Sequence, residues 1–310
     1  MLKIITARAP RLSVIIPHLN EPQDLACCLD ALTAQRADGI DFEIIVADNG
    51  SREPPFAVCA AYADVRLEIE TIPGPGPARN RGAAVAGAPL LAFIDADCIA
   101  GPGWVSTIVG FMDANPAIGF AGGDIRILSQ DAGRLTSIEA YESVYSYRAR
   151  LYVERHGFAA TGNMAVRADV FRAVGPFGGI ASMEDTEWGQ RATAAGCRIG
   201  YMEDACVYTP SCRSFLELAQ RWDRHVAHEF RKVRGRPLRI LMWAASSLAM
   251  AASPAAEIAC ILKSERLQGM RNRWLALTCL VRVRFYRAWR MLSLAFGWDA
   301  ERLTAGWNRQ

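Results

Sequence analysis

The sequence lacks any pair of cysteines with the C-x-x-C spacing that marks many zinc sites and redox centres. Its nine cysteines are an odd number and are scattered along the 310 residues. Neither a disulfide framework nor a structural zinc site is therefore indicated, because both need paired cysteines or ligands at short spacings. We expect a protein of a reducing compartment.

Long apolar runs are also missing. No apolar core of signal-peptide length precedes the first predicted strand, so we expect no secretory leader. An uncharged stretch near the C-terminus, residues 240–256, has only 17 residues, is rich in Ala and Ser, and contains Pro254. A helix that crosses a bilayer needs about 20 predominantly apolar residues. A full transmembrane span is therefore not expected there.

Acidic residues are scarce in the last part of the chain. Residues 231–310 hold 15 Lys and Arg against 4 Asp and Glu, a net charge of +11. Because the whole chain has a net charge of +3, the first 230 residues have a net charge of −8. Basic residues are interleaved with Trp, Phe and Leu in 238–262 and 273–298. This pattern favours a segment that lies on an anionic membrane surface, and the alternative is a helical subdomain with a solvated basic face. We expect no nucleic acid partner, because no recognised binding module is present.

Strand-like and helix-like segments alternate in the first half of the chain. Short β-branched runs predict strands, and apolar residues at helical spacing predict helices. The predicted strands cover residues 12–17, 42–48, 66–72 and 89–95, and the predicted helices cover 21–35 and 76–87. Asn20 is expected to cap the first of these helices. The alternation implies an α/β protein with a largely parallel sheet covered on both faces.

The second half is less regular. We expect a strand over residues 119–128, a turn at residues 161–163 followed by a helix, and a helix that begins at Glu184 and leads into a strand. Two domains are expected, over residues 1–230 and 231–310, with the second helical, basic and amphipathic.

Acidic and amide side chains follow three of the predicted strands. The first strand leads into residues 17–21, the second ends at Asp48, and the fourth ends at Asp95-Ala96-Asp97. In parallel sheets, ligands bind beyond the carboxyl ends of the strands. Asp95 and Asp97 would repel each other unless they point apart as turn residues or share a cation.

Six motifs carry a resemblance to a known family. They are SVIIPHLNE, IIVADNGS, GPGPARNRGAA, AFIDADC, TGNMAVR and EDTEWGQR. In this order, over residues 12–225, the chain resembles family 2 glycosyltransferases of the GT-A fold. The resemblance implies a metal-dependent inverting enzyme that moves a sugar from a nucleotide diphosphate to an acceptor hydroxyl.

The resemblance also implies roles for individual residues on the donor side. Asp48 matches the acidic residue that hydrogen-bonds the nucleotide base, and Pro17 and Glu21 flank the same pocket. Arg79 and Asn80 match the pair beside the diphosphate, where an Arg fork at a helix start suits phosphate oxygens.

The D-x-D signature of the family matches Asp95 and Asp97. The resemblance implies that Asp97 binds Mg²⁺ or Mn²⁺, while Asp95 orients the ribose or supports the metal. Asn163 falls in the part that lies near the donor sugar and the acceptor. Glu184 and Asp185 match the E-D motif, and we expect Asp185 to be the general base, with Glu184 supporting it or contacting the acceptor.

Some residues depart from the family pattern. His18 and Leu19 stand where Thr-Tyr is frequent, and Asn49 replaces a frequent second aspartate. Gln220, Arg221 and Trp222 lack the two-residue gap of the Q-x-x-R-W motif of processive synthases, so we expect transfer of a single sugar.

The expected donor is a UDP-sugar, and the expected acceptor is a lipid-linked or cell-envelope saccharide. The basic C-terminal region would hold the enzyme on the cytoplasmic, inner face of the cell membrane as a peripheral protein. Two other functions stay open at this point: a sugar nucleotidyltransferase and a non-catalytic nucleotide-sugar-binding protein.

Overall fold

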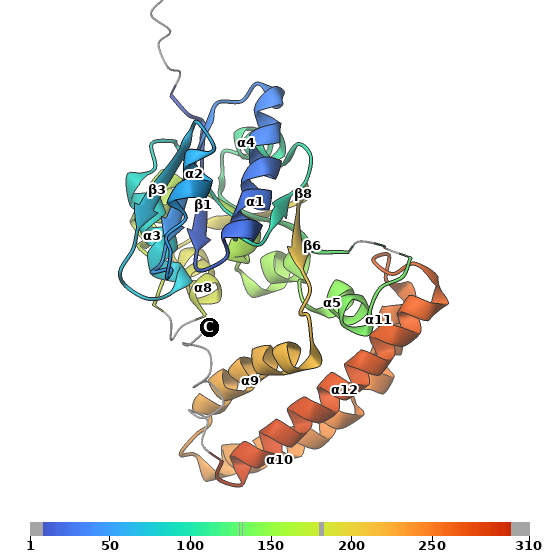
Figure 1. Cartoon of the computed structure of the whole chain (residues 1–310). Coiled ribbons are helices and arrows are strands. Elements are labelled where there is room, and N and C mark those ends of the chain that lie inside the picture. Colours follow the sequence, from blue (N-terminus) through green and yellow to red (C-terminus); the bar gives the residue numbers. More distant parts are fainter. Residues whose placement is uncertain (1–8, 130, 132, 180–182, 299–310) are drawn as a thin grey trace, which may run out of the picture. The chain divides into compact units, whose positions relative to one another are not determined.

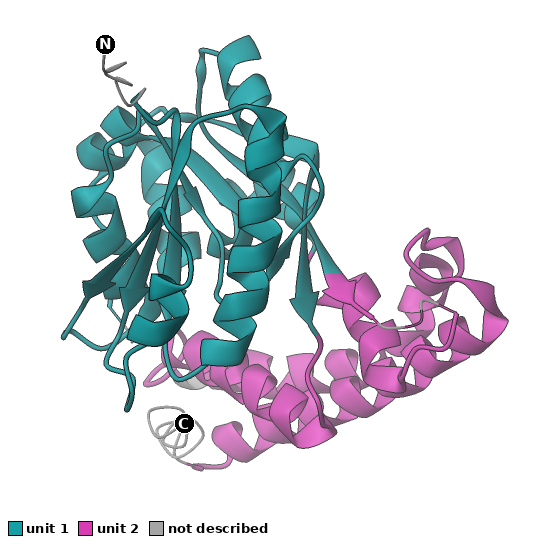
Figure 2. Cartoon of the chain, turned by 45° about the horizontal axis from the view of Figure 1, so that its top comes forward, with its two compact units in different colours: residues 1–126, 148–210 teal, residues 127–147, 211–310 magenta. Residues whose placement is uncertain are grey.

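The computed structural model describes residues 9–129, 131, 133–179 and 183–298. The chain divides into two compact units, which are coloured separately in Figure 2. Unit 1 comprises residues 1–126 and 148–210, and unit 2 comprises residues 127–147 and 211–310. This division into compact units does not coincide with the domain boundary expected at residue 230, which stays a prediction.

Unit 1 is built on a mostly parallel sheet (Figure 1). Among the described residues, the sheet has eight strands in the order β3-β2-β1-β4-β7-β6-β8-β5. The first four strands pair in parallel and are β1 Leu12–His18, β2 Phe42–Asp48, β3 Val65–Ile69 and β4 Leu90–Phe93. The expected α/β architecture is therefore confirmed.

The other half of the sheet contains antiparallel strand pairs. Strand β7 (Met164–Arg167) pairs antiparallel with both β4 and β6 (Ile118–Leu128), and β5 (Ile99–Ala100) pairs antiparallel with β8 (Arg198–Pro210). The prediction of a turn followed directly by a helix missed β7, which lies between them. Four residues of strand between a short turn and a helix leave no clear alternation in the sequence.

Helices cover the sheet on both faces, as the strand pattern predicted. Along β1, Val14 and Ile16 enter one buried apolar cluster with helices α1 and α4, whereas Ile15 enters a second cluster with Trp188 of α8. Successive side chains of a strand point to opposite faces, so both faces of β1 are buried. The helices of unit 1 are α1 Pro22–Ala34, α2 Phe56–Ala60, α3 Pro75–Val85, α4 Trp104–Ala114, α6 Ala149–Leu151, α7 Ala168–Val174 and α8 Glu184–Ala194.

Unit 2 is helical. Its helices are α5 Ser137–Tyr145, α9 Phe215–Arg231, α10 Pro237–Ala252, α11 Pro254–Lys263 and α12 Gly269–Ala295. The fully buried carboxylate of Glu142 on α5 accepts hydrogen bonds from the Arg221 guanidinium on α9 (2.7 Å) and from the backbone of Cys212 (2.7 Å). This pairing keeps the buried charge compensated and ties α5 to α9.

No single described helix is long and apolar enough to cross a membrane, although the pair α10 and α11, bent by 45° at the break between them, has a suitable length and composition.

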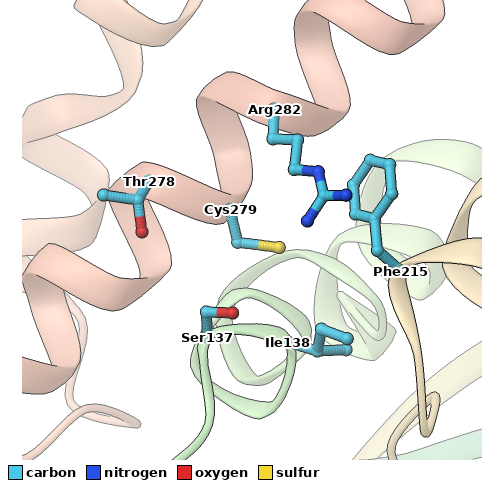
Figure 3. Close-up of a pocket in the computed structure, with 6 residues that line it drawn as sticks. All are labelled: Ser137, Ile138, Phe215, Thr278, Cys279 and Arg282. Atoms are coloured by element: carbon cyan, nitrogen blue, oxygen red, sulfur yellow. The ribbon is translucent and has the colours of Figure 1, made fainter.

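Unit 2 also contains a cavity of about 300 Å³ between α5, α9 and α12 (Figure 3). Ser137, Ile138, Phe215, Thr278, Cys279 and Arg282 line this cavity.

Candidate functional site

The candidate site lies in unit 1, beyond the carboxyl ends of β1, β2 and β4. These strands are neighbours in the order β2-β1-β4, and β1 is parallel to both of the others. Their ends therefore meet at one edge of the sheet, as the sequence predicted. Two groups of polar side chains gather there: one around Asp48, and one around Arg79.

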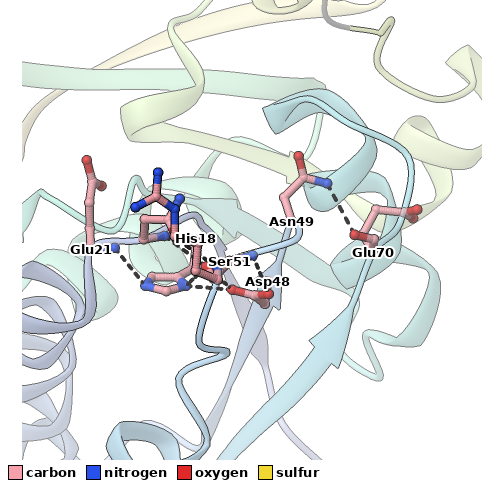
Figure 4. Close-up of polar contacts among 8 residues, drawn as sticks. His18, Glu21, Asp48, Asn49, Ser51 and Glu70 are labelled. Atoms are coloured by element: carbon pink, nitrogen blue, oxygen red, sulfur yellow. Dashed lines mark hydrogen bonds and ion pairs between the residues drawn. The ribbon is translucent and has the colours of Figure 1, made fainter. Parts of the chain in front are cut away.

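Asp48, which the resemblance assigns to the nucleotide base, is buried at the end of β2 (Figure 4). Its Oδ1 lies 2.8 Å from Nδ1 of His18, and its Oδ2 accepts a hydrogen bond from the backbone N–H of Ser51 (3.1 Å). The backbone N–H of Glu21 donates to Nε2 of His18 (3.2 Å), so Nδ1 carries the proton and donates to Asp48. Asp48 is thus held in a fixed orientation, and its role toward the base stays a prediction.

The loops around Asp48 are tied to each other by hydrogen bonds between backbone N–H groups and side chains. Asn20 has φ +57°, its backbone N–H donates to Ser51 Oγ (2.8 Å), and its Oδ1 accepts from the backbone N–H of Arg52 (2.9 Å). The expectation that Asn20 caps α1 is wrong, because Glu21 is the residue at that position and makes no side-chain capping bond. The side chain of Asn20 is instead used to join the two loops.

Pro17 and Glu21 flank this group from β1 and from the start of α1. Pro17 lies opposite Ala47 in the β1–β2 register, and the Glu21 side chain is exposed. Asn49 is a structural residue: its Nδ2 donates to the carbonyl of Ile72 (2.8 Å), and its Oδ1 accepts from the backbone N–H of Gly74 (2.6 Å). Asn49 therefore shapes the loop that leads into α3.

Asp95 and Asp97 do share one site. Their carboxylate oxygens and Sγ of Cys98 all lie within 4.8 Å of one another, which makes them a group able to hold a metal ion. Burial and the neighbouring Asp95 carboxylate raise the pKa of Asp97 to about 6. Burial and both aspartates raise the pKa of the Cys98 thiol well above its usual range, and this thiol donates to Asp97 Oδ1 (3.4 Å).

Arg79 is the cation at the centre of the acidic group. Its guanidinium is buried, and it donates to Asp95 Oδ1 (2.5 Å) and to Glu184 Oε1 (2.9 Å). Burial alone would lower the pKa of Arg79, but the carboxylates of Asp95 and Glu184 raise it above its ordinary value. Arg79 thus joins α3, the end of β4 and the start of α8, a connection that the sequence did not reveal.

Asp185 lies next to Glu184 in the first turn of α8. Burial and the Glu184 carboxylate raise the pKa of Asp185 to about 6. Its Oδ1 accepts from the backbone N–H of Thr186 (2.6 Å). A carboxylate with a pKa near neutrality, held by its own helix start, is suited to general base catalysis.

Asn80 and Asn163 use their amides inside the protein. Asn80 Nδ2 donates to the carbonyl of Phe177 (3.0 Å), while its Oδ1 accepts from the backbone N–H of the same residue (2.9 Å). Asn163 Oδ1 accepts from the indole of Trp104 (2.9 Å), and its Nδ2 donates to the carbonyls of Asp124 and Ala205 (both 2.7 Å). In this conformation both side chains position neighbouring loops, and their predicted contacts with the nucleotide sugar stay untested.

Comparison with known proteins identifies the family. The family described as Glycosyl transferase family 2 matches residues 13–175, more than half of the chain. The chain belongs to glycosyl transferase family 2. It is therefore a glycosyltransferase, and its sheet and helices form the GT-A fold.

Two relatives illustrate the range of this glycosyltransferase family. Glycosyltransferase AglE of Haloferax volcanii is 32% identical over 227 residues, which cover 70% of this chain and 72% of that protein. Validoxylamine A glucosyltransferase of Streptomyces hygroscopicus subsp. limoneus is 38% identical over 118 residues, which cover 36% of this chain and 26% of that protein.

Two solved structures are similar in fold. Mannosyltransferase PcManGT from Pyrobaculum calidifontis, in complex with GDP-Man and Mn²⁺, has a TM-score of 0.56 and 16% identity, over 98% of this chain and 89% of that one. S. aureus TarS, residues 1–349, has a TM-score of 0.52 and 15% identity, over 93% of this chain and 92% of that one. At this level of identity the likeness concerns the fold alone.

The acidic pair of this glycosyltransferase fits a divalent cation. Two carboxylates supply hard oxygen ligands, which Mg²⁺ and Mn²⁺ prefer. The raised pKa of Asp97 reflects its burial and its repulsion by Asp95, and a bound cation would offset both. The Cys98 thiol stays protonated and serves Asp97 as a hydrogen-bond donor, so the metal would be held by oxygen atoms.

Proposed function

We propose that this glycosyltransferase moves one sugar from a nucleotide-diphosphate sugar to an acceptor hydroxyl, with inversion at the anomeric carbon. The observation that supports this most is the buried Arg79, which pairs with Asp95 and Glu184 and is also close to Asp185, while Asp95 shares the candidate cation site with Asp97. Arg79 therefore links the candidate cation site, through Asp95, to the start of the helix that carries the candidate base. Asp97 and Asp185 both have a raised pKa of about 6, whereas Asp95 and Glu184 are paired with Arg79.

Asp97, with Asp95, would hold Mg²⁺ or Mn²⁺. The bound cation would neutralise the charge that develops on the leaving nucleoside diphosphate. Arg79 is held to Asp95 by a charge-assisted bond, so it keeps that carboxylate oriented. Asp185 would accept the proton of the attacking hydroxyl, and Glu184 would fix the position of Arg79 and the start of α8.

The donor is proposed to be a UDP-sugar. The Asp48 carboxylate is buried and accepts three hydrogen bonds from His18 and Ser51, so the Ser51 loop would have to move aside for it to accept from a base N–H such as that of uracil. Pro17 and Glu21 would form the walls of the same pocket. Asn80 and Asn163 would act on the donor sugar and diphosphate by holding the loops that surround them.

The acceptor is proposed to be a lipid-linked or cell-envelope saccharide at the cytoplasmic face of the cell membrane. The support is the basic and apolar composition of residues 231–310, which would keep the enzyme peripheral to that surface. Single transfer, as opposed to polymerisation, is proposed because the Q-x-x-R-W motif is absent from the sequence.

A nucleoside-diphosphate release screen tests the proposal. Purified protein is incubated with Mn²⁺ or Mg²⁺, a panel of UDP-, GDP- and dTDP-sugars, and a membrane lipid extract. Asp97→Ala is the variant, and Asp64→Ala is the matched control, because Asp64 is an exposed aspartate outside the site.

We expect metal-dependent release from one donor by the wild type and by Asp64→Ala, and loss of this release in Asp97→Ala. Release of pyrophosphate in place of a nucleoside diphosphate would overturn the proposal. Equal release by Asp97→Ala would overturn the assignment of the cation to this carboxylate pair.

A further inference from the structure

Helices α10 and α11 of unit 2 carry a continuous apolar stripe on their exposed side. The apolar residues of this stripe, large side chains together with alanines, follow one another at helical spacing, which puts them on one face of each helix. Their side chains are 42% to 76% exposed. They are Leu238, Leu241, Met242, Leu248, Ile258 and Leu262, and the exposed residues between them at the same spacing are Ala245, Ala249, Ala252, Ala255 and Ala259.

The opposite side of α10 is packed against α12. The indole of Trp243 donates to the carbonyl of Met291 (3.0 Å), Ser247 is buried, and Arg284 Nη1 contacts Sδ of Met250 (3.3 Å). These residues are displaced by about half a turn from the exposed stripe. Helix α11 is packed through its buried Ile261, and within the described part of unit 2 only this inner side of the two helices has a partner. A helix that is apolar all round is normally buried in protein or in a membrane.

Exposed cations stand at both ends of the stripe. Arg234, Arg236 and Arg239 lie at the start of α10, and Lys263 and Arg266 lie at the end of α11, where the exposed Glu265 offsets one of them. The only acidic residue within α10 and α11 is Glu257, which turns inward to Arg284 (3.1 Å). The outer face therefore combines an apolar centre with a positive border, which complements acyl chains beneath anionic headgroups.

A second copy of the chain fits this face less well. Two such faces stacked on each other would bring the positive borders together, and the one exposed carboxylate among the described residues 234–266, Glu265, offsets only one of their five cations. A transmembrane orientation is also disfavoured. The 16 residues of α10 span only about 24 Å, and the longer pair of α10 and α11 is bent by 45° and bound on its inner side to Arg284, which would have to enter the hydrocarbon with it.

We propose that the outer face of α10 and α11 is the docking surface of the protein on an anionic bilayer, with both helices lying in the plane of the headgroup–acyl boundary. The apolar stripe enters the acyl region, and the cations at its ends contact lipid phosphates. This inference rests on the peripheral membrane association in the proposed function and assigns it to one surface.

Vesicle co-sedimentation of the full chain tests the assignment. The probes are vesicles of phosphatidylcholine alone and vesicles that also contain phosphatidylglycerol. The test variant is Leu241→Gln/Met242→Gln/Leu248→Gln. The control variant is Met270→Gln/Trp274→Gln/Phe285→Gln on α12, whose side chains are 58% to 62% exposed. Circular dichroism and thermal melts of each variant establish that it is folded.

Each large apolar side chain that leaves the acyl region lowers binding by about tenfold. We expect the α10 variant to bind anionic vesicles at least about 100-fold more weakly than the wild type, and the α12 control to stay within about threefold. The wild type should bind vesicles of phosphatidylcholine alone more weakly than vesicles that also contain phosphatidylglycerol. Raising NaCl from about 0.1 to about 0.5 M should weaken wild-type binding to the anionic vesicles. Alkaline carbonate should release the bound protein, because the helices do not cross the bilayer.

Several outcomes would overturn the inference. It is overturned if the folded α10 variant binds anionic vesicles with wild-type affinity, or if the α12 control loses as much vesicle binding. It is also overturned if the bound protein is not released by alkaline carbonate. A dimer in gel filtration that the α10 variant abolishes would assign the face to a second copy instead. No wild-type binding to any vesicle would refute both the docking surface and the peripheral association, whereas nucleoside-diphosphate release tests the chemistry independently of either result.

Discussion

The pH dependence of activity offers a direct test of Asp185 as the general base. Burial and Glu184 raise the pKa of Asp185 from 3.8 to about 6. A general base must be ionised to accept a proton, so activity is lost as the pH falls through this value. At pH 7.5 the carboxylate is about 97% ionised, whereas at pH 5 only about 9% is ionised. We therefore expect kcat/KM for the donor to fall about tenfold between these two pH values.

An aspartate with an ordinary pKa would behave differently. With a pKa of 3.8, the group would still be about 94% ionised at pH 5, and activity would hardly change. The predicted difference is therefore about tenfold at a pH where most proteins remain folded. This margin is large enough to be measured in a nucleoside-diphosphate release assay.

The contribution of Asp97 to the pH profile must be separated from that of Asp185, because the pKa of Asp97 is also raised to about 6. Protons compete with the metal for Asp97, so saturating Mn²⁺ removes this contribution from the profile. At saturating metal we expect the acidic limb to have a slope of one in a logarithmic plot. At limiting metal the slope should approach two, because two carboxylates must then be ionised.

The Asp185→Asn variant provides the matching control. It removes the base and should lower the rate by about 10² to 10⁴-fold while leaving nucleotide binding in place. It should also stabilise the protein at pH 7.5 by up to about 3 kcal/mol, because a raised pKa means that the charged form is disfavoured on folding above pH 6. This stabilisation should disappear below about pH 4, where the carboxyl group is protonated both folded and unfolded.

Two results would refute the reasoning about Asp185. One is a flat profile of kcat/KM between pH 7.5 and 5 at saturating Mn²⁺. The other is an Asp185→Asn variant that keeps more than about a tenth of the wild-type rate. Either result would require another group to take the proton of the acceptor hydroxyl.

Three further predictions concern the site. Arg79→Met should abolish nucleoside-diphosphate release and lower the free energy of unfolding by about 1 to 3 kcal/mol, because the partly exposed Asp95 and Glu184 would lose their charge-assisted hydrogen bonds; a denaturant titration with wild-type stability would contradict this. Gly76→Ala should lower Tm by several degrees in a thermal melt, because the added Cβ would collide with the backbone carbonyl of Gly178. An unchanged Tm would contradict this prediction and would mean that the backbone at Gly178 shifts to make room. Treatment with EDTA should stop release, and added Mn²⁺ should restore it; full activity in EDTA would exclude the proposed cation.

The sequence predicted well those features that depend on local patterns. Alternating β-branched runs and helical spacing identified β1, β2, β4, α1 and α3 to within a few residues. Their periods of two and 3.6 residues are visible in short windows. Parallel strands then imply that the residues after them meet at one edge, and this topological rule is sufficient to place the acidic pair at the predicted site.

Local patterns were less informative for the second half of the sheet. Strand β7 has four residues and pairs antiparallel with strands that are distant in the sequence. Its register is set by long-range pairing, and no feature of its own sequence requires it. For the same reason Asn20 was assigned to a helix cap, whereas its side chain bridges two loops.

The composition of the chain and the order of its motifs by themselves determined the family resemblance, the α/β class and the basic C-terminal region. Only the tertiary structure showed that Arg79 joins Asp95 to Glu184, a residue 105 positions away, and that Asn163 turns inward to Trp104. Likewise, the exposed stripe on α10 and α11 became visible only when α12 was seen to cover their other side. Motifs depend on neighbouring residues, whereas burial and charge pairing depend on which distant segments fold against each other.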